Sequence, residues 1–285
     1  MRKLKLSLLI IGLFFSLFTS TSLVAQTNVL DGVYVKEHTP ERKVIPYTYL
    51  READVQWSKR IWRRIDLREK KNHPLYFPIE KINNRKSIVQ VILDGVLNDG
   101  TITAYDGNDD EFKKPLTKSE VQGLLAGKID TQYVDDPENP GNLIPKVINN
   151  PFKPESIKKM DIKEDWFFDK QRSVLDVRII GISCLQDVLE EDGVSVRGQK
   201  TLFWIYFPEA RYVFANAEVF NRKNDAERRS YEDIFWKRDF SSYVRKEANV
   251  YDRFISDYKT GMDALLEAER VKEDIFNYEH DMWEY

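Results

Sequence analysis

The first 25 residues determine where this chain has to fold. Three basic residues within the first five positions precede an apolar run over residues 6–18, and Ala25 and Gln26 flank the predicted signal-peptide cleavage point. The run is shorter than the roughly 20 residues that span a bilayer, and an uncleaved anchor helix is the alternative interpretation. We therefore expect residues 26–285 to fold in an oxidising compartment outside the cytoplasm. Cys184 is the only cysteine, so no internal disulfide can form and the fold depends on packing.

Charge and composition narrow the classes of function. Without the three basic residues of the signal segment, the net charge of −3 becomes −6, which argues against binding to nucleic acid or to anionic lipid. Aromatic residues make up 13% and charged residues 32% of the chain. These fractions indicate a sizeable core and a large solvated or partner-facing surface. No later segment is apolar enough to span a bilayer, so we expect membrane contact only through a partner.

Proline content and hydrophobic periodicity divide the chain into segments. Residues 26–50 have no helical period but many apolar side chains, which is typical of an extended arm laid over a neighbouring subunit. A long proline-rich stretch later in the chain indicates a loop between two halves. The predicted organisation is a signal peptide (1–25), an extended arm (26–50), an N-terminal helical or α+β half (51–134), a proline-rich loop (135–154), a β-rich half with an aromatic helix (155–249) and a helical C-terminal tail (250–285).

Capping signals and apolar spacing predict the helices. The strongest signal is Thr117 with Glu120, a capping box before residues 118–129. Helices are also predicted over residues 51–71, 88–97 after Ser87, 230–244 after Ser230, and 262–278. The helix over 230–244 is expected to place four side chains in the core: Trp236, Phe240, Tyr243 and Val244.

β-Branched and aromatic runs predict strands over residues 101–105, 173–185, 200–207 and 212–220, with a hairpin turn at 208–211. The predicted fold class is therefore α+β, with an antiparallel or mixed sheet covered by helices, an extended N-terminal arm and a helical C-terminal tail. The similarity of Trp57-Ser58-Lys59-Arg60 to Trp236-Lys237-Arg238 also raises the hypothesis of an internal duplication.

A search for chemistry finds no recognisable active site. The three histidines lack metal-ligand spacing, and no HExxH, CxxC or GxSxG motif is present. The acidic loop at residues 106–112 places acidic or amide side chains at alternating positions, but Glu111 replaces the glycine and Thr117 the glutamate of a calcium loop. A solvated turn is the better interpretation. We expect no enzyme activity, no metal and no cofactor.

The basic residues between Trp57 and Lys71 leave two interpretations open. They form either a solvated helix face or a protein interface rich in Trp and Arg, and the segment at 236–246 has the same character. The predicted interface residues are Trp57, Trp62, Arg63, Arg64, Lys237, Arg238, Arg245, Lys246 and, from the arm, Tyr34 and Tyr47.

Several segments, taken together, resemble one known family. They are WSKRIWRRIDLREKKNHPLYFP, ITAYDGNDDEF, DVRIIGI and the run from Phe203 to Arg253, FWIYFPEARYVFANAEVFNRKNDAERRSYEDIFWKRDFSSYVRKEANVYDR. With the exported N-terminus, they are similar to the gliding-motility N protein, the GldN/PorN family of the type IX secretion system. The resemblance extends over nearly all of residues 26–285, although the arm and the proline-rich loop match only in general character.

This resemblance implies a non-catalytic structural subunit in the periplasm. Such a subunit assembles with an outer-membrane lipoprotein, the K subunit, into a ring, and it contacts the periplasmic region of the M subunit of the inner-membrane motor. A different class of function is an exported glycan-binding or glycan-processing protein, in which Trp166, Trp204 or Trp283 would form the sugar platform.

Overall fold

The computed structural model describes residues 42–126, 129–135, 143–149, 152–189, 195–224 and 226–282. All of them belong to one compact unit, residues 41–285. The predicted signal peptide, its cleavage residues Ala25 and Gln26, and Tyr34 and Trp283 lie outside the described residues. Among the residues described, no helix is long and apolar enough to cross a membrane.

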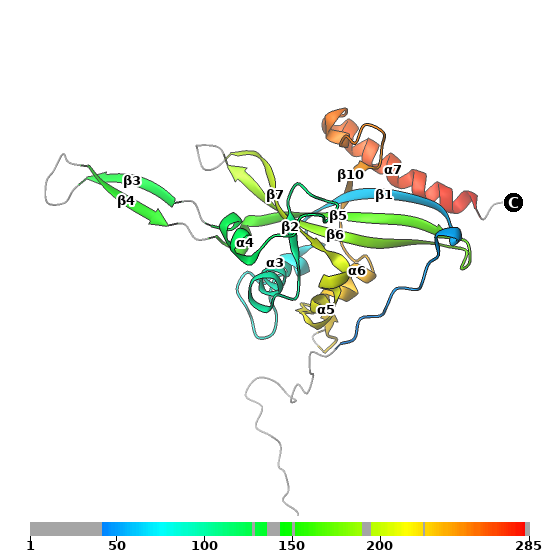
Figure 1. The fold of residues 1–285 in the computed structure, drawn as a ribbon, viewed down its shortest axis with the longest axis horizontal. Helices are drawn as coiled ribbons and strands as arrows, with labels where there is room; N and C mark the ends of the chain where they lie inside the picture. The colour runs from blue at the N-terminus through cyan, green and yellow to red at the C-terminus, as the bar shows by residue number, and fades with distance from the viewer. Residues whose placement is uncertain are drawn as a thin grey trace, which may run out of the picture. The chain divides into compact units, whose positions relative to one another are not determined.

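The centre of the fold is a six-stranded antiparallel sheet with the strand order β10-β1-β5-β6-β7-β2 (Figure 1). The predicted fold class, α+β with a sheet covered by helices, is confirmed. The strands of this sheet are β1 (Val55–Asp66), β2 (Ala104–Asp106), β5 (Ile157–Asp169), β6 (Val174–Leu189), β7 (Val196–Tyr206) and β10 (Tyr243–Glu247).

Alternating side chains give the sheet an apolar face. Met160 of β5, Cys184 of β6 and Phe203 of β7 are directly opposite one another across the three strands, and all three are buried. The next row in register repeats this pattern with Ile162, Ile182 and Ile205. Because side chains on a strand point alternately to the two faces, these rows form one continuous core surface.

The helices cover this core and are capped where the sequence predicts it. The Ser87 hydroxyl accepts from the Gln90 N–H at the start of α3, and Gly100 ends the following π turn with a φ of 64°. Thr117 caps α4 in the same way. The helical elements are η1 (Glu52–Asp54), α2 (His73–Tyr76), α3 (Ile88–Leu93), η2 (Asp94–Asp99), α4 (Lys118–Leu124), η3 (Pro154–Ser156), α5 (Phe207–Asn216), α6 (Tyr231–Trp236), η4 (Ile255–Asp257) and α7 (Gly261–Asp281).

Two apolar clusters hold the helices to the sheet. The larger cluster contains side chains of α3, α5 and α6 packed on β5, β6 and β7. In the smaller one, Ala268, Val271 and Ile275 of α7 pack on Ile61 of β1 and Val244 of β10, and α7 runs alongside these two strands (Figure 1). The predicted C-terminal helix is therefore confirmed. Leu265 of this helix is 54% exposed.

Three predicted elements are wrong. Residues 51–71 are not a helix, since their central part is β1, which pairs with β5 over almost its whole length. Residues 212–220 are not a strand after a hairpin, because Pro208 lies in the first turn of α5 and α5 continues to Asn216. The helix predicted over 230–244 ends at Trp236, and the chain returns to the sheet as β10.

Other differences concern β structure that the sequence did not indicate. β5 was missed altogether, although it is a central strand. The proline-rich loop at 135–154 is also partly wrong, because β3 (Ile129–Asp135) and β4 (Leu143–Asn149) form an antiparallel pair. A further two-stranded pair joins β8 (Glu218–Val219) and β9 (Arg229–Ser230).

The duplication hypothesis fails on these observations. Trp57 lies in a strand, whereas Trp236 ends a helix. The two similar sequence segments therefore do not fold alike.

Candidate interaction site

The polar face of the sheet is a ladder of charged cross-strand pairs. Arg60, Trp62 and Arg64 of β1 are directly opposite Asp165, Lys163 and Asp161 of β5. Three pairs in succession place opposite charges or a cation and an aromatic ring side by side, which stabilises neighbouring strands. This register explains why β1 can carry so many basic residues in the middle of a sheet.

The buried end of this ladder is centred on Asp161. Arg64 donates to both carboxylate oxygens, at 2.6 and 2.9 Å, and Arg245 donates to one of them at 2.7 Å. The side chains of Arg64 and Asp161 are 7% and 6% exposed. Arg64 also donates to the Gln199 side chain, so the guanidinium is hydrogen-bonded on both edges within the fold.

Trp62 occupies the middle of the ladder between two lysines. Its indole N–H donates to Asp110 at 2.9 Å, and the ammonium groups of Lys163 and Lys246 lie 5.6 and 4.4 Å from its ring centre. Burial lowers the pKa of Lys163, and the neighbouring Asp110 partly opposes this shift. Lys246 also pairs with Asp252. One carboxylate of the acidic loop at residues 106–112 thus holds a tryptophan and a lysine.

The opposite face of β1 buries a second arginine. Arg63 donates to the Ser242 hydroxyl at 2.9 Å, and burial lowers the pKa of its guanidinium. Nearby, Arg238 donates to both oxygens of Glu164, at 2.9 and 3.0 Å, and this carboxylate is completely buried. Arg238 itself has a left-handed φ of 54° just after α6, a conformation that costs free energy in a residue other than glycine.

The predicted interface residues therefore lie mostly inside the chain. Arg63, Arg64 and Lys246 are buried, and Arg238 and Arg245 are engaged in ion pairs. Among the predicted interface residues that the structure describes, only Lys237 is well exposed. Trp57 stacks on Tyr278 of α7 with ring centres 4.5 Å apart. That these residues contact a partner stays a prediction.

Of the four predicted core residues, Phe240 and Val244 are buried, at 7% and 3% exposure. Trp236 and Tyr243 are 49% and 37% exposed. The chain leaves the helix after Trp236, so the four residues do not share one helical face. Two of the tryptophans expected to form a sugar platform are covered in the fold. Trp204 is buried, and the Arg238 guanidinium lies over Trp166, 5.1 Å from its ring centre.

Residues 42–50, here called the strap, cross α5 and α6 in an irregular extended conformation. Arg211 donates to the Ile45 carbonyl at 2.7 Å, and Arg178 donates to the Thr48 carbonyl at 2.6 Å. At one end of the strap, Arg42 forms an ion pair with Asp233 at 2.9 Å. Hydrogen bonds to the strap backbone and the ion pair of Arg42 thus hold the strap on the folded body.

Tyr47 anchors the centre of the strap. The Arg211 guanidinium lies 4.1 Å from its ring centre and that of Arg178 lies 5.0 Å away, and the ring stacks on Trp236 at 5.8 Å. Burial raises the pKa of the Tyr47 hydroxyl. Of the predicted interface residues, Tyr47 and Arg238 line a cavity beside the strap.

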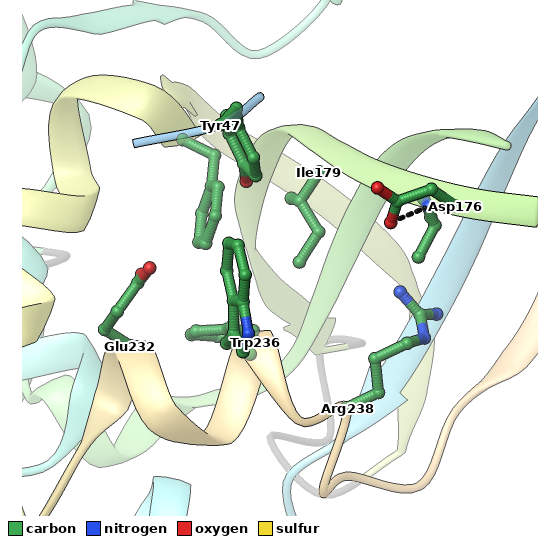
Figure 2. A pocket seen from close by; sticks show the side chains of 9 residues that line it. Tyr47, Asp176, Ile179, Glu232, Trp236 and Arg238 are labelled. Atoms are coloured by element: carbon green, nitrogen blue, oxygen red, sulfur yellow. Dashed lines mark hydrogen bonds between the residues drawn. The ribbon is translucent and has the colours of Figure 1, made fainter. Parts of the chain in front are cut away.

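This cavity, the strap cavity, has a volume of about 170 Å³ and lies between the strap, α6 and β6 (Figure 2). Its wall combines aromatic and aliphatic side chains with two acidic groups and one basic group. The lining residues are Tyr47, Asp176, Val177, Ile179, Phe207, Glu232, Phe235, Trp236 and Arg238.

Three residues of the body that build the strap site were not predicted: Arg178, Arg211 and Glu232. Arg211 and Glu232 are buried, and Arg178 is partly buried. Arg178 lies in the apolar run DVRIIGI, and a single charge inside such a run is a signal that could have identified it, because the charge needs a partner when the run is buried. Glu232 has Asp233 beside it in the sequence and carries no such signal.

The outer face of α7 carries exposed apolar side chains. Here this name denotes four exposed side chains, Met262, Leu265, Leu266 and Phe276, at 70%, 54%, 62% and 65% exposure. None of them belongs to the Ala268, Val271 and Ile275 face that packs on the sheet. Clusters of exposed apolar side chains are typical of protein-interaction sites.

No cluster of titratable groups indicates catalysis in the described part of the chain. Cys184 is buried, and burial raises the pKa of its thiol to about 12. It is thus a core residue and not a nucleophile. No group of His, Cys, Asp and Glu able to hold a metal ion occurs among the described residues.

Comparison with known proteins assigns the chain to a family. A search of curated proteins found no match. The model of one protein family, described as gliding motility associated protein GldN, matches residues 50–284. This range includes the whole sheet and all the helices that cover it. The chain therefore belongs to the GldN family of gliding-motility and type IX secretion components.

Proposed function

We propose that this protein is a non-catalytic structural subunit in the periplasm. It assembles with an outer-membrane lipoprotein, the K subunit, into the ring of the type IX secretion machine, and it contacts the periplasmic region of the M subunit of the motor. The family match over residues 50–284 carries this proposal. The predicted signal peptide supports the periplasmic location, and the K subunit provides the attachment to the outer membrane.

The outer face of α7 supports a role in assembly. Its apolar side chains stay in solvent in the single chain, and covering them with a partner would remove apolar area from water. Acidic and basic residues also lie along the helix, including the Arg270–Asp274 pair at 2.7 Å. An apolar centre with a polar rim is the usual composition of a protein interface.

Size-exclusion chromatography with light scattering tests the proposal. Residues 26–285 are measured alone and mixed with the soluble part of the K lipoprotein. A stable joint complex is the expected result. A monomer that does not bind the K protein would contradict the proposed function.

The part played by α7 is tested with Leu266→Glu combined with Phe276→Glu. We expect this variant to keep its thermal unfolding curve, since exposed substitutions change stability by about 0.5 kcal/mol or less, and to lose the joint complex. Ile82→Glu is the matched control, because Ile82 is 59% exposed and lies in the loop between α2 and α3. Equal complex formation by both variants would exclude the outer face of α7.

A further inference from the structure

The strap cavity contains two buried polar atoms that the described chain leaves without partners. Oε1 of Glu232 accepts both hydrogen bonds from Arg211, at 2.8 and 2.6 Å, whereas Oε2 accepts none. Arg238 uses Nη2 on Glu164, and its Nη1 donates to no described residue. The Glu232 residue is 9% exposed. Buried polar groups are normally hydrogen-bonded, so two exceptions in one cavity indicate that a bound group completes them.

The charges around the cavity are already balanced. Glu232 is paired with Arg211, and Arg238 is paired with Glu164. Asp176 is paired with Arg172 at 3.1 Å. An ionic ligand would therefore bring an uncompensated charge into a partly buried site, which is costly. The free acceptor and the free donor are better satisfied by neutral groups, such as amide or hydroxyl groups.

The two atoms belong to opposite ends of the cavity. Figure 2 shows the Trp236 indole between the Glu232 carboxylate and the Arg238 guanidinium, with Tyr47 facing the indole. Apolar side chains, including Ile179 and Phe207, also line the cavity. An extended ligand with a donor near one end, an acceptor near the other and an apolar group between them fits this arrangement.

The same surface already binds one extended polypeptide, the strap. Val44, Tyr47 and Leu50 are the partly buried positions of residues 42–50, a spacing of three that equals the period of a polyproline II helix. Arg211 and Arg178 donate to strap carbonyls. Arginine donors beside aromatic rings thus recognise backbone on this side of α6, and Arg238 presents a further arginine donor beside Trp166 and Phe240.

We propose that the strap cavity binds a short extended segment of another polypeptide, which lies beside the strap. A backbone N–H of this segment donates to Glu232 Oε2, and a backbone carbonyl accepts from Arg238 Nη1. An apolar side chain of the segment packs between Tyr47 and Trp236 on one side and Ile179 on the other. This site is separate from the outer face of α7, and it does not depend on the proposed function.

The probe is a tripeptide blocked at both ends, N-acetyl-Gly-Leu-Gly-amide, titrated into ¹⁵N-labelled protein comprising residues 26–285. The Trp236 indole resonance is assigned with Trp236→Phe. A ligand of this size is expected to bind in the millimolar range, with a saturable shift of this resonance. Glu232→Gln keeps an oxygen for Arg211 but replaces the free acceptor with an NH₂ donor, and it should weaken binding about tenfold or more. Glu52→Gln, at an exposed position in η1, is the matched control and should bind normally.

A second variant keeps the proposal testable if Glu232→Gln does not fold. Val177→Phe fills the cavity from β6 without touching either ion pair, and it should also abolish the shift. Equal binding by the wild type and both variants would overturn the proposal. Saturable binding of N-acetylglucosamine without binding of the tripeptide would also overturn it, because the cavity would then be a sugar site. A crystal structure in which water hydrogen-bonds to both Glu232 Oε2 and Arg238 Nη1, and is not displaced by the tripeptide, would overturn it as well.

Discussion

Substitution of Asp161 tests whether the buried end of the charged ladder stabilises the fold. This carboxylate accepts hydrogen bonds from two arginines, and its side chain is 6% exposed. Asp161→Ala leaves the buried Arg64 guanidinium without a counter-ion. Removal of one partner of a buried ion pair costs about 3–5 kcal/mol. For a chain of this length the same change lowers the melting temperature by about 6–20 °C.

The ladder provides its own control at the solvent-exposed end. Asp165 accepts two hydrogen bonds from Arg60, just as Asp161 does from Arg64, but these side chains are 29% and 44% exposed. Asp165→Ala should therefore cost only about 0–1 kcal/mol. Urea unfolding monitored by circular dichroism measures both variants, with midpoints compared at equal m-values.

A third variant separates the loss of the pair from the burial of a lone charge. Arg64→Met combined with Asp161→Leu removes both charges and should recover most of the stability that Asp161→Ala loses. Arg245 is 29% exposed and can turn towards solvent. The reasoning is refuted if Asp161→Ala and Asp165→Ala unfold at the same urea concentration.

Further predictions concern packing, the thiol, the arginines after α6 and acid stability. Gly181→Ala should cost about 1–3 kcal/mol in urea unfolding, because a Cβ there would lie 2.4 Å from the Phe112 ring, and adding Phe112→Ala should restore part of it. Cys184 should not react with a thiol reagent in the folded protein and should react fully in denaturant, since burial raises its pKa to about 12. Arg238→Glu with Arg245→Glu should lower the melting temperature, because each removes an ion pair to a buried carboxylate; an unchanged melting curve would show that these pairs contribute nothing. The hydrogen bond from Arg172 lowers the pKa of Asp169 in the folded protein. The ionised Asp169 carboxylate therefore stabilises the fold above the unfolded pKa of about 3.9, and this stabilisation is lost as the pH falls below that value. The stability difference between wild type and Asp169→Asn should thus shrink below about pH 4, and a pH-independent difference would contradict this assignment.

The sequence predicted the elements whose signals are local. The capping boxes at Ser87 and Thr117 are contained within four residues each, and both helix starts are confirmed. The apolar β-branched runs of β6 and the aromatic run of β7 were also recognisable, because burial on a sheet requires such side chains directly. In these segments, neighbouring residues determine the conformation.

The sequence failed where distant partners determine the conformation. In β1, Arg60 and Arg64 are neutralised by β5 residues about a hundred positions away, so charged residues occupy positions that are apolar in an ordinary buried strand. The spacing of Ile61, Trp62 and Ile65 in this strand is also compatible with one face of a helix. The strap cavity was unpredictable for the same reason, since Tyr47, Ile179 and Trp236 come from three distant segments.

These contacts change which surface is expected to meet a partner. The sequence pointed to the arginines and lysines of residues 57–71 and 237–246, because charged side chains are usually exposed. In the fold, Arg64 and Lys246 are buried in ion pairs and cation–π contacts. Extracting them for a partner would remove the bidentate pair from Asp161 and one cation–π contact from Trp62. The outer face of α7 has no such cost, since Leu266 and Phe276 already lie in solvent. A partner that covers α7 gains apolar burial and breaks nothing, so interface mapping should begin with this helix.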